Sequence, residues 1–459
     1  MSNLPESWKL LPLAEIAKVE WGNTSITKKS YVESGYTAFS ATGPDGFLDK
    51  YQWEGPAVVL SAIGARCGKC FFANGKWTAI KNTIVIQGDP DAIDHKILHY
   101  YLNDASKWAV SGSGQPFITL KTVRETMVPV PPLDQQKQIV AEIEKQFSRL
   151  DEAVANLKRV KANLKRYKAA VLKAAVEGRL VKTEAELARR EGRSYETGAQ
   201  LLQRILETRR SQWKGKGKYK EPVAPDTTDL PELPEGWVWA SVGGLGDVIG
   251  GLTKNPKRSA FPMKLPYLRV ANVYANELRL DEIEKIGVEK SELEKLLVLK
   301  GDLLIVEGNG SPEQIGRLAI WDGSISPCVH QNHLIKVRLP SECLPKWVVG
   351  WLMSPDGRNC IRNVASSTSG LYTLSVGKVG GLPVPLPPLA EQQRIVAEID
   401  RRFSLTEGLE AQVNANHMRA ERLRQSVLAT AFNGNLVDVS DMRRGLMPAC
   451  VAEYQGHGG

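Results

Sequence analysis

Pro131–Glu144 reads PPLDQQKQIVAEIE, and Pro387–Asp400 reads PPLAEQQRIVAEID. Nine of these fourteen positions are identical, at an offset of 256 in the numbering. The same offset matches Gly178 with Gly434, with no gap between the PPL motif and the glycine. A match this long indicates that the chain contains an internal duplication.

A second, shorter motif opens each copy. Pro5–Trp8 reads PESW and Pro234–Trp237 reads PEGW, at an offset of 229 in the numbering. This offset is smaller than 256 because the stretch from the opening motif to the PPL motif is longer in the second copy. We therefore predict two units, each a variable globular part followed by a constant helical part.

The constant parts are predicted to be long helices. Pro131 and Pro132 block helix upstream, and no further proline occurs before Pro222. From Asp134 to Glu177 a helix would be about 65 Å long. Its apolar residues recur every seven positions, at Ile143, Leu150, Leu157, Leu164 and Val171.

The second long helix has the same beginning and end but a poorer middle, where Thr406, Glu410 and His417 fall on the expected seam. A helix of this length cannot bury an apolar stripe by itself. We expect the two copies to pair with each other, antiparallel, about a pseudo-two-fold axis. The basic run Lys158–Lys173 contains seven Lys/Arg and no acidic residue, which suits DNA phosphates, an acidic partner or solvent alike.

Composition sets the broad class. The 459 residues carry a formal charge of +9, and 42% of them are hydrophobic, so the chain can bury several cores and suits a polyanionic partner. Six scattered cysteines do not form a disulfide scaffold. The start of the chain lacks a signal-peptide pattern, and no apolar run is long enough to span a membrane. We expect a soluble, cytoplasmic protein.

The variable parts are predicted to be mixed α/β domains. Strand-like runs occur at Pro56–Ser61 and Gly301–Val306, each followed by a glycine-rich turn. Both parts end in a polar, glycine-containing segment, Ser111–Leu120 and Ser366–Leu374, which can present hydroxyls and amides to DNA or serve as a connector. In the stretch between the two copies, Ala199–Trp213 is predicted to be a short helix and the rest a linker.

Catalytic motifs are missing. Gly64–Cys70 has the wrong spacing for a phosphate-binding loop. Cys67-x2-Cys70 lacks a second pair of ligands nearby, and His330–His333 (HQNH) is not a zinc-hydrolase motif. The Pro-Pro-Tyr/Phe motif of amino-methyltransferases is absent as well. No catalytic residue and no metal ligand is predicted.

Two variable domains, each followed by a PPLxxQxxIVAEI helix, resemble the specificity subunit of type I restriction–modification enzymes. The series Gly301–Val306, Ile315–Arg317 and His330–His333 is similar to the target-recognition domains of that family. The first domain departs from it, with Pro56-Ala57 in place of Gly-Asp and Lys81–Thr83 in place of the His-Gln-Asn cluster.

The resemblance implies an α+β fold with two mixed α/β target-recognition domains at opposite ends of a long antiparallel two-helix coiled coil. Each domain would read one half of a bipartite site in double-stranded DNA, and the helices would fix the spacing and dock partners. Two methyltransferase subunits would use S-adenosylmethionine, and motor–nuclease subunits would use ATP and magnesium. This chain itself would be non-catalytic and bind no cofactor.

The predicted organisation is a first recognition domain, its spacer helix, a linker with a short helix, a second recognition domain, its spacer helix and a tail: 1–130, 131–182, 183–233, 234–386, 387–440 and 441–459. The predicted spacer and subunit-docking residues are Gln136, Ile139, Ile143, Phe147, Leu150, Leu157, Leu164, Gln392, Ile395, Ile399 and Phe403.

The predicted DNA-contacting residues are polar or basic, and all lie in the loops of the variable parts. Arg66 and Arg317 are expected to read guanine, and the Asn and Gln side chains adenine. In the first domain they are Thr24, Lys28, Lys29, Arg66, Lys69, Lys81, Ser113, Gln115 and Thr119. In the second they are Thr253, Lys254, Lys257, Arg258, Asn309, Gln314, Arg317, His330, Gln331, Asn332, His333, Ser367, Thr368, Ser369 and Tyr372.

Two other interpretations remain. The chain could be a coiled-coil scaffold whose globular parts bind other proteins, which predicts no dependence on DNA spacing. It could also be an enzyme with an unfamiliar site, which predicts activity of the isolated chain.

Overall fold

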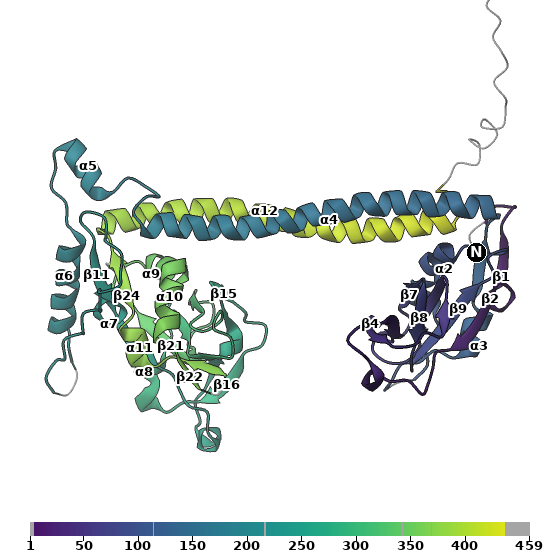
Figure 1. The fold of residues 1–459 in the computed structure, drawn as a ribbon. Coiled ribbons are helices and arrows are strands. Elements are labelled where there is room, and N and C mark those ends of the chain that lie inside the picture. The colour runs from purple at the N-terminus through teal and green to yellow at the C-terminus, as the bar shows by residue number, and fades with distance from the viewer. Residues whose placement is uncertain (1–3, 113, 215–216, 342, 369, 437–459) are drawn as a thin grey trace, which may run out of the picture. The chain divides into compact units, whose positions relative to one another are not determined.

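The computed structural model describes residues 4–112, 114–214, 217–341, 343–368 and 370–436. It divides into unit 1 (Met1–Arg159 with Val413–Gly459) and unit 2 (Val160–Gln412). The boundary between the units passes through two long helices, α4 (Leu133–Val176) and α12 (Leu389–Phe432), so each unit contains a portion of both (Figure 1). None of the described helices is long and apolar enough to span a membrane.

The bounds of helices α4 and α12 match the sequence repeat to the residue. Each has 44 residues, and their first and last residues match at the same offset as the PPL motifs. The start and the end of α4 lie within one residue of the prediction. Each helix is followed by a glycine with a left-handed backbone, Gly178 at φ 67° and Gly434 at φ 78°. Glycine adopts this conformation without strain, and it ends a helix.

In unit 1 the beginning of α4 lies beside the end of α12. Arg424 pairs with Asp151 and lies 4.9 Å from the ring centre of Phe147. Ile143 lies one turn before Phe147 in α4, and it shares a buried apolar cluster with Phe432, the last residue of α12. The two segments therefore run antiparallel.

In unit 2 the end of α4 lies beside the beginning of α12. Lys168 pairs with Glu410 at 2.8 Å, and further along α4 Leu172 packs in one cluster with Ile399. The buried line on α12 follows Ile399, Thr406, Val413 and Ala420 at a spacing of seven. Small side chains on this line explain why the seam is poor in the sequence. Pairing of the two helices and the α+β class are confirmed.

The globular part of unit 1 contains two four-stranded sheets. The first has the order β2-β9-β6-β7 with antiparallel neighbours, and the second has the order β4-β3-β8-β5 with β3 and β8 parallel. Their bounds are β2 Ala17–Trp21, β9 Thr83–Gly88, β6 Ala57–Ser61, β7 Cys70–Ala73, β4 Gly43–Leu48, β3 Tyr36–Ser40, β8 Lys76–Ala79 and β5 Trp53–Glu54. The helices are α1 Leu13–Ile16, α2 His95–Leu102 and α3 Leu120–Glu125, with short 3-10 turns at Lys28–Ser30 and Ala105–Lys107.

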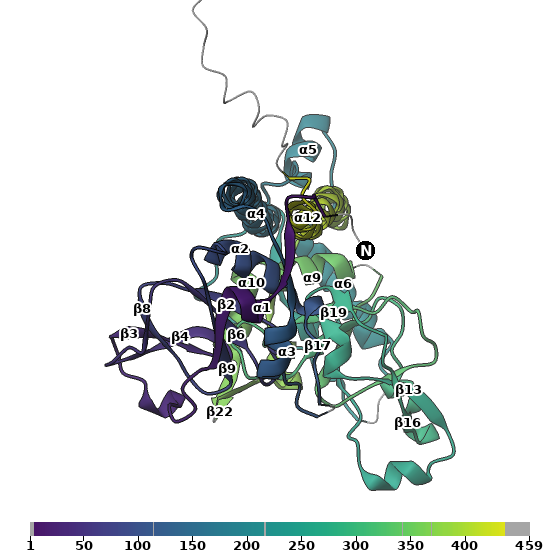
Figure 2. The same cartoon turned by 90° about the vertical axis from the view of Figure 1, so that its right-hand side faces the viewer.

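Unit 2 repeats the first of these sheets, with the order β12-β21-β17-β19, and adds two three-stranded sheets, β16-β13-β20 and β18-β23-β22. Figure 2 shows that β13 and β16 lie on the side of unit 2 away from α12. The strand bounds are β12 Asp247–Gly250, β13 Lys264–Leu268, β14 Val273–Tyr274, β15 Glu277–Leu278, β16 Glu284–Gly287, β17 Leu303–Val306, β18 Gly308–Asn309, β19 Leu318–Ile320, β20 Val329–His330, β21 Leu334–Arg338, β22 Ser366–Thr368 and β23 Leu371–Thr373. The helices are α7 Val242–Leu245, α8 Leu293–Leu296, α9 Pro345–Met353, α10 Pro355–Val364 and α11 Val376–Gly380, with 3-10 turns at Pro256–Ala260, Val270–Asn272 and Lys290–Glu292.

A two-stranded ribbon closes each globular part. In unit 1, β1 (Lys9–Pro12) pairs with β10 (Met127–Val130). In unit 2, β11 (Val238–Ser241) pairs with β24 (Pro383–Leu386). The residue numbers of β1 and β11 differ by the offset of the opening motifs, and those of β10 and β24 differ by the offset of the PPL motifs. Each ribbon therefore pairs a strand beside the opening motif with a strand beside the PPL motif. The ribbon brings the start of each globular part to its end.

Buried amides explain the glutamine of the PPL motif. Gln136 donates to the carbonyls of Pro131 and Ala92 at 2.8 and 3.0 Å and accepts from the Asp94 N–H at 2.6 Å. Gln392 likewise donates to the Pro387 carbonyl at 3.0 Å and accepts from the Leu344 N–H at 3.2 Å. Both are fully buried inside their own unit. The sequence predicted both among the spacer and subunit-docking residues, and in the structure their side chains are satisfied within their own units.

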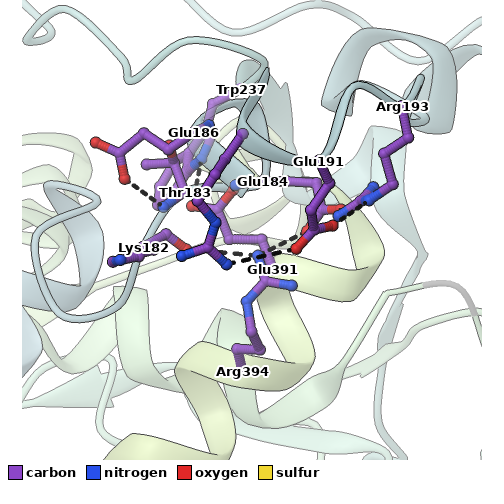
Figure 3. Close-up of polar contacts among 10 residues, drawn as sticks. Lys182, Thr183, Glu184, Glu186, Glu191, Arg193, Trp237, Glu391 and Arg394 are labelled. Atoms are coloured by element: carbon purple, nitrogen blue, oxygen red, sulfur yellow. Dashed lines mark hydrogen bonds and ion pairs between the residues drawn. The ribbon is translucent and has the colours of Figure 1, made fainter. Parts of the chain in front are cut away.

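The stretch after α4 contains two helices where the sequence predicted one, α5 (Glu184–Glu191) and α6 (Gly198–Ser211). Figure 3 shows how Glu184 holds α5 to the start of α12. Its carboxylate pairs with Arg394 at 2.7 Å and Arg193 at 2.6 Å, and its N–H donates to Glu391 at 2.8 Å. Glu391 also accepts from the Trp237 indole at 3.0 Å.

Burial opposes ionisation of both carboxyls in this cluster. For Glu184, the hydrogen bonds and charges of Arg193 and Arg394 outweigh burial and hold its pKa below the usual value. For Glu391, burial dominates and raises the pKa. No pattern in the sequence marks this cluster, because its members come from three distant segments of the chain.

Candidate nucleic-acid interface

Three strand ends meet at one edge of the first sheet of unit 1. Strands β2 and β6 end there and β9 begins there, because both are antiparallel to β9. Backbone contacts join the loops at this edge: Asn23 bridges Ile80, and the Ala62 N–H donates to the Asn82 carbonyl at 3.0 Å. The segment before α3 joins them through the Gly64 N–H, which donates to the Pro116 carbonyl at 2.9 Å. We call these loops, residues 22–29, 62–69, 80–82, 111–112 and 114–119, the loop edge of unit 1.

The loop edge of unit 1 gathers the predicted residues of this domain. Those that the structure describes are exposed: Thr24, Lys28, Lys29, Arg66, Lys69, Lys81, Gln115 and Thr119. Ser113 lies outside the described residues. Thr119 also caps α3, because its hydroxyl accepts from the Thr122 N–H. The loop edge therefore presents five Lys/Arg side chains to solvent.

Asp45 is a partner of this edge that sequence reasoning missed. It accepts from Lys28, Tyr31, Ser40 and Thr42. Burial opposes its ionisation, but these hydrogen bonds outweigh burial and lower the pKa of Asp45 to about 2. Lys28 is thus held by an ion pair. The four partners of Asp45 lie 3 to 17 residues earlier in the chain, at spacings that match no known motif.

Unit 2 has a loop edge on the same backbone frame. Strands β12 and β17 end there and β21 begins there. Leu252 bridges Gln331, and the Glu307 N–H donates to the His333 carbonyl at 2.9 Å. The polar segment joins through the Leu374 N–H, which donates to the Glu307 carbonyl at 2.8 Å. We call residues 252–258, 307–317, 330–333, 366–368 and 370–374 the loop edge of unit 2.

Most predicted residues of this domain also lie at its loop edge. The exposed ones are Thr253, Lys254, Lys257, Gln314, His333 and Ser367. The half-buried ones are Asn309, Arg317, Gln331, Asn332 and Tyr372. The backbone of Thr368 belongs to β22, and Ser369 lies outside the described residues.

Two predicted DNA contacts are corrected because their side chains are internal. His330 is 0% exposed, and its Nδ1 lies 3.0 Å from the Leu334 carbonyl oxygen. Burial, with a contribution from the charge of Lys336, lowers its pKa to about 4, so the ring is neutral near pH 7. Arg258 is 9% exposed. Its guanidinium binds both carboxylate oxygens of Glu292, at 3.0 and 3.1 Å.

Arg317 is engaged within unit 2. Its Nη2 donates to the Val270 carbonyl at 3.0 Å, and its guanidinium lies 4.7 Å from the ring centre of Tyr274. The sequence predicted Arg317 as a guanine reader. These contacts occupy one face and one end of the guanidinium, so the structure supports a role in holding the β14–β15 turn.

The cysteine pair of unit 1 is arranged for packing. The thiols donate to different carbonyls, Cys67 to Ala62 and Cys70 to Leu102, each at 3.3 Å. Burial raises the pKa of both thiols. Among the residues that the structure describes, no group of three or more His, Cys, Asp or Glu could hold a metal ion.

Fold and site together define a class of protein: an internally duplicated α+β protein with two loop edges. The two loop edges share the same backbone contacts but carry different side chains. The family model described as "Type I restriction modification DNA specificity domain" matches residues 5–166 and 234–415. The chain belongs to this family and contains two copies of its domain.

The chain is similar to several proteins named as specificity subunits of type I restriction enzymes. The chain is 28% identical over 314 residues to the type I restriction enzyme EcoKI specificity subunit of Escherichia coli K12, covering 67% of this chain and 57% of that relative. It is 23% identical over 436 residues to the type I restriction enzyme EcoDI specificity subunit of E. coli, covering 94% of this chain and 89% of that relative. The chain thus spans little more than half of the first relative and most of the second.

A solved structure shares the fold. It is a chain from work on "complex assembly and conformational transition of the type I R-M system", with a TM-score of 0.61 at 17% sequence identity. The match covers 94% of this chain and 99% of that one.

Proposed function

We propose that this chain is the DNA-recognition subunit of a type I restriction–modification complex and reads a split site, one half with each domain. The observation that carries the proposal is the pair of loop edges. Their backbone frames coincide, while their side chains differ, as two readers of different sequences require. Family membership supports this role.

Electrostatics favours DNA at these edges. The chain carries a net charge of +9, and five Lys/Arg side chains are exposed at the loop edge of unit 1. Phosphate contacts supply affinity, and amides, hydroxyls and carboxylates on the same loops can meet base edges.

In this proposal the paired helices set the separation of the readers and dock partner subunits in the cytoplasm. The partners are two methyltransferase subunits, which bind S-adenosylmethionine and methylate adenine, and motor–nuclease subunits, which use ATP and magnesium. The chain supplies recognition and no catalytic group. The seam residues predicted for docking, such as Ile143 and Ile399, pack inside their own units, so partners would meet other faces of the helices.

Genome-wide adenine methylation tests the function. Cells that express this chain with the methyltransferase of its system are compared with cells that express the methyltransferase alone. A new motif of two short half-sites with a fixed gap is expected only with the chain present. An unchanged methylome, with an active methyltransferase, would contradict the proposal and favour the protein-interaction scaffold.

Basic residues of the loop edge should contribute affinity without sequence choice. For Lys69→Ala/Lys81→Ala in the assembled methyltransferase, we expect weaker binding to all sequences and a salt dependence whose slope falls by about 2, one for each lost phosphate contact. Titrations of fluorescent DNA at several salt concentrations measure both. Lys50→Ala/Lys76→Ala, which removes two exposed charges of unit 1 outside the loop edge and outside the long helices, is the matched control. An unchanged slope would remove Lys69 and Lys81 from the interface.

A further inference from the structure

The shared frame identifies positions at which the two readers can be compared directly. Ala62 and Glu307 occupy equivalent places. Each donates its N–H to a carbonyl of the loop before β9 or β21, at Asn82 or His333, and the carbonyl of each accepts an N–H from the polar segment, at Ile118 or Leu374. The two domains therefore place different side chains, a methyl group and a carboxylate, on the same backbone point.

In unit 2 that point carries a pair of polar side chains. The Glu307 Oε2 lies 3.0 Å from the His333 Nδ1. The Glu307 side chain is 29% exposed and the His333 side chain 55% exposed, so both reach the surface of the loop edge. The backbone bonds of Glu307 to both neighbouring loops fix its Cα, so its side chain starts from a defined place.

A carboxylate is unfavourable beside phosphates, since DNA presents a dense negative charge. It is favourable against the exocyclic amino group of a base, which is a hydrogen-bond donor in the major groove. In the neutral tautomer in which the His333 Nδ1 donates its proton to the carboxylate, the Nε2 is an acceptor as well. The pair thus presents acceptors on the surface proposed to face DNA.

We propose that Glu307, oriented with His333, is a specificity-determining residue of the second half-site. It accepts a hydrogen bond from an exocyclic amino group, cytosine N4 or adenine N6, and disfavours guanine and thymine, which offer oxygen acceptors there. The first domain, with Ala62 at the equivalent point, lacks this requirement. The inference rests on the proposed function, because it assumes that the loop edge meets DNA.

The test uses the complete complex and Glu307→Gln, which keeps the shape but lets the side chain donate as well as accept. Methylation rates are measured on duplexes with all four bases at each position of the second half-site. Discrimination at one position should fall on the order of 10- to 100-fold, with the first half-site and the gap unchanged. The preferred base in the wild type distinguishes cytosine from adenine.

Two controls make the outcome decisive. Glu207→Gln on α6 changes the same charge away from the loop edge and should behave as the wild type. His333→Ala removes the partner while leaving the backbone bonds of Glu307 in place, and it should loosen the same position even if Glu307→Gln folds poorly. Unchanged discrimination, or an equal loss on every sequence, would overturn the inference. Absence of any split motif with the wild type would instead contradict the proposed function.

Discussion

Gln136→Ala is expected to lower the stability of unit 1 by about 3–4 kcal/mol, because it removes three hydrogen bonds and leaves buried backbone groups without partners. The groups affected are the carbonyls of Pro131 and Ala92 and the N–H of Asp94. Since Asp94 caps α2, that helix and the first turn of α4 should open together. Hydrogen exchange of the full chain, read at α2 and at the start of α4, measures the loss.

The controls for this substitution lie in the same chain. Gln138→Ala alters an exposed amide two positions along α4 and should change stability by less than about 0.5 kcal/mol. Gln392→Ala should destabilise unit 2 and leave exchange at α2 unchanged. A Gln136→Ala protein within about 1 kcal/mol of the wild type would show that the buried amide does not secure the helix.

Lengthening both long helices is expected to change the DNA site itself. Insertion of seven residues after Arg159 and after Gln412 adds about 10 Å to the pair and preserves the heptad register. At about 3.4 Å per base pair, the gap of the methylated motif should grow by about three base pairs, with both half-sites unchanged. Methylation at the original spacing should fall to background, because two linked readers gain affinity at one separation only.

An insertion in α4 alone serves as the control, since it removes the register between the helices. We expect loss of the split motif in that variant. If the double insertion methylates the original motif, the helices do not set the spacing, and this part of the proposal is wrong.

The sequence predicted the two long helices well because each copy of the repeat gives an independent indication of where a helix begins and ends. The repeat of the PPL motif and its glycine placed the ends of α4 within one residue, and the heptad of Ile143 and Val171 indicated a paired helix. The weak seam of α12 was harder, since its buried line uses Thr406 and Ala420. The tryptophan of each opening motif is evident in the sequence. The hydrogen bond from the Trp8 indole to Gln135, at the start of α4, could not be predicted from it.

The candidate site was predictable only as a set of loops. Exposed lysines and the glycine-rich segments did fall on the two loop edges. His330 and Arg258 were misjudged because a sequence does not show which way a side chain turns at a strand end or in a 3-10 turn. The partner of Arg258 is Glu292, 34 residues away, and such a pairing leaves no local pattern. Glu307 escaped notice because its significance depends on comparison with Ala62 in the folded frame.

The ribbons that close the two globular parts have an evolutionary consequence. Lys9 faces Val130 across one ribbon, and Val238 faces Leu386 across the other. Entry and exit of each domain thus stand side by side, and the loops between them are free to diverge. Exchange of the chain segment between these strands, with one crossover at each end, would deliver a whole domain with its own closure. New DNA targets can then arise by exchange of such cassettes, while the helices and their partners stay as they are.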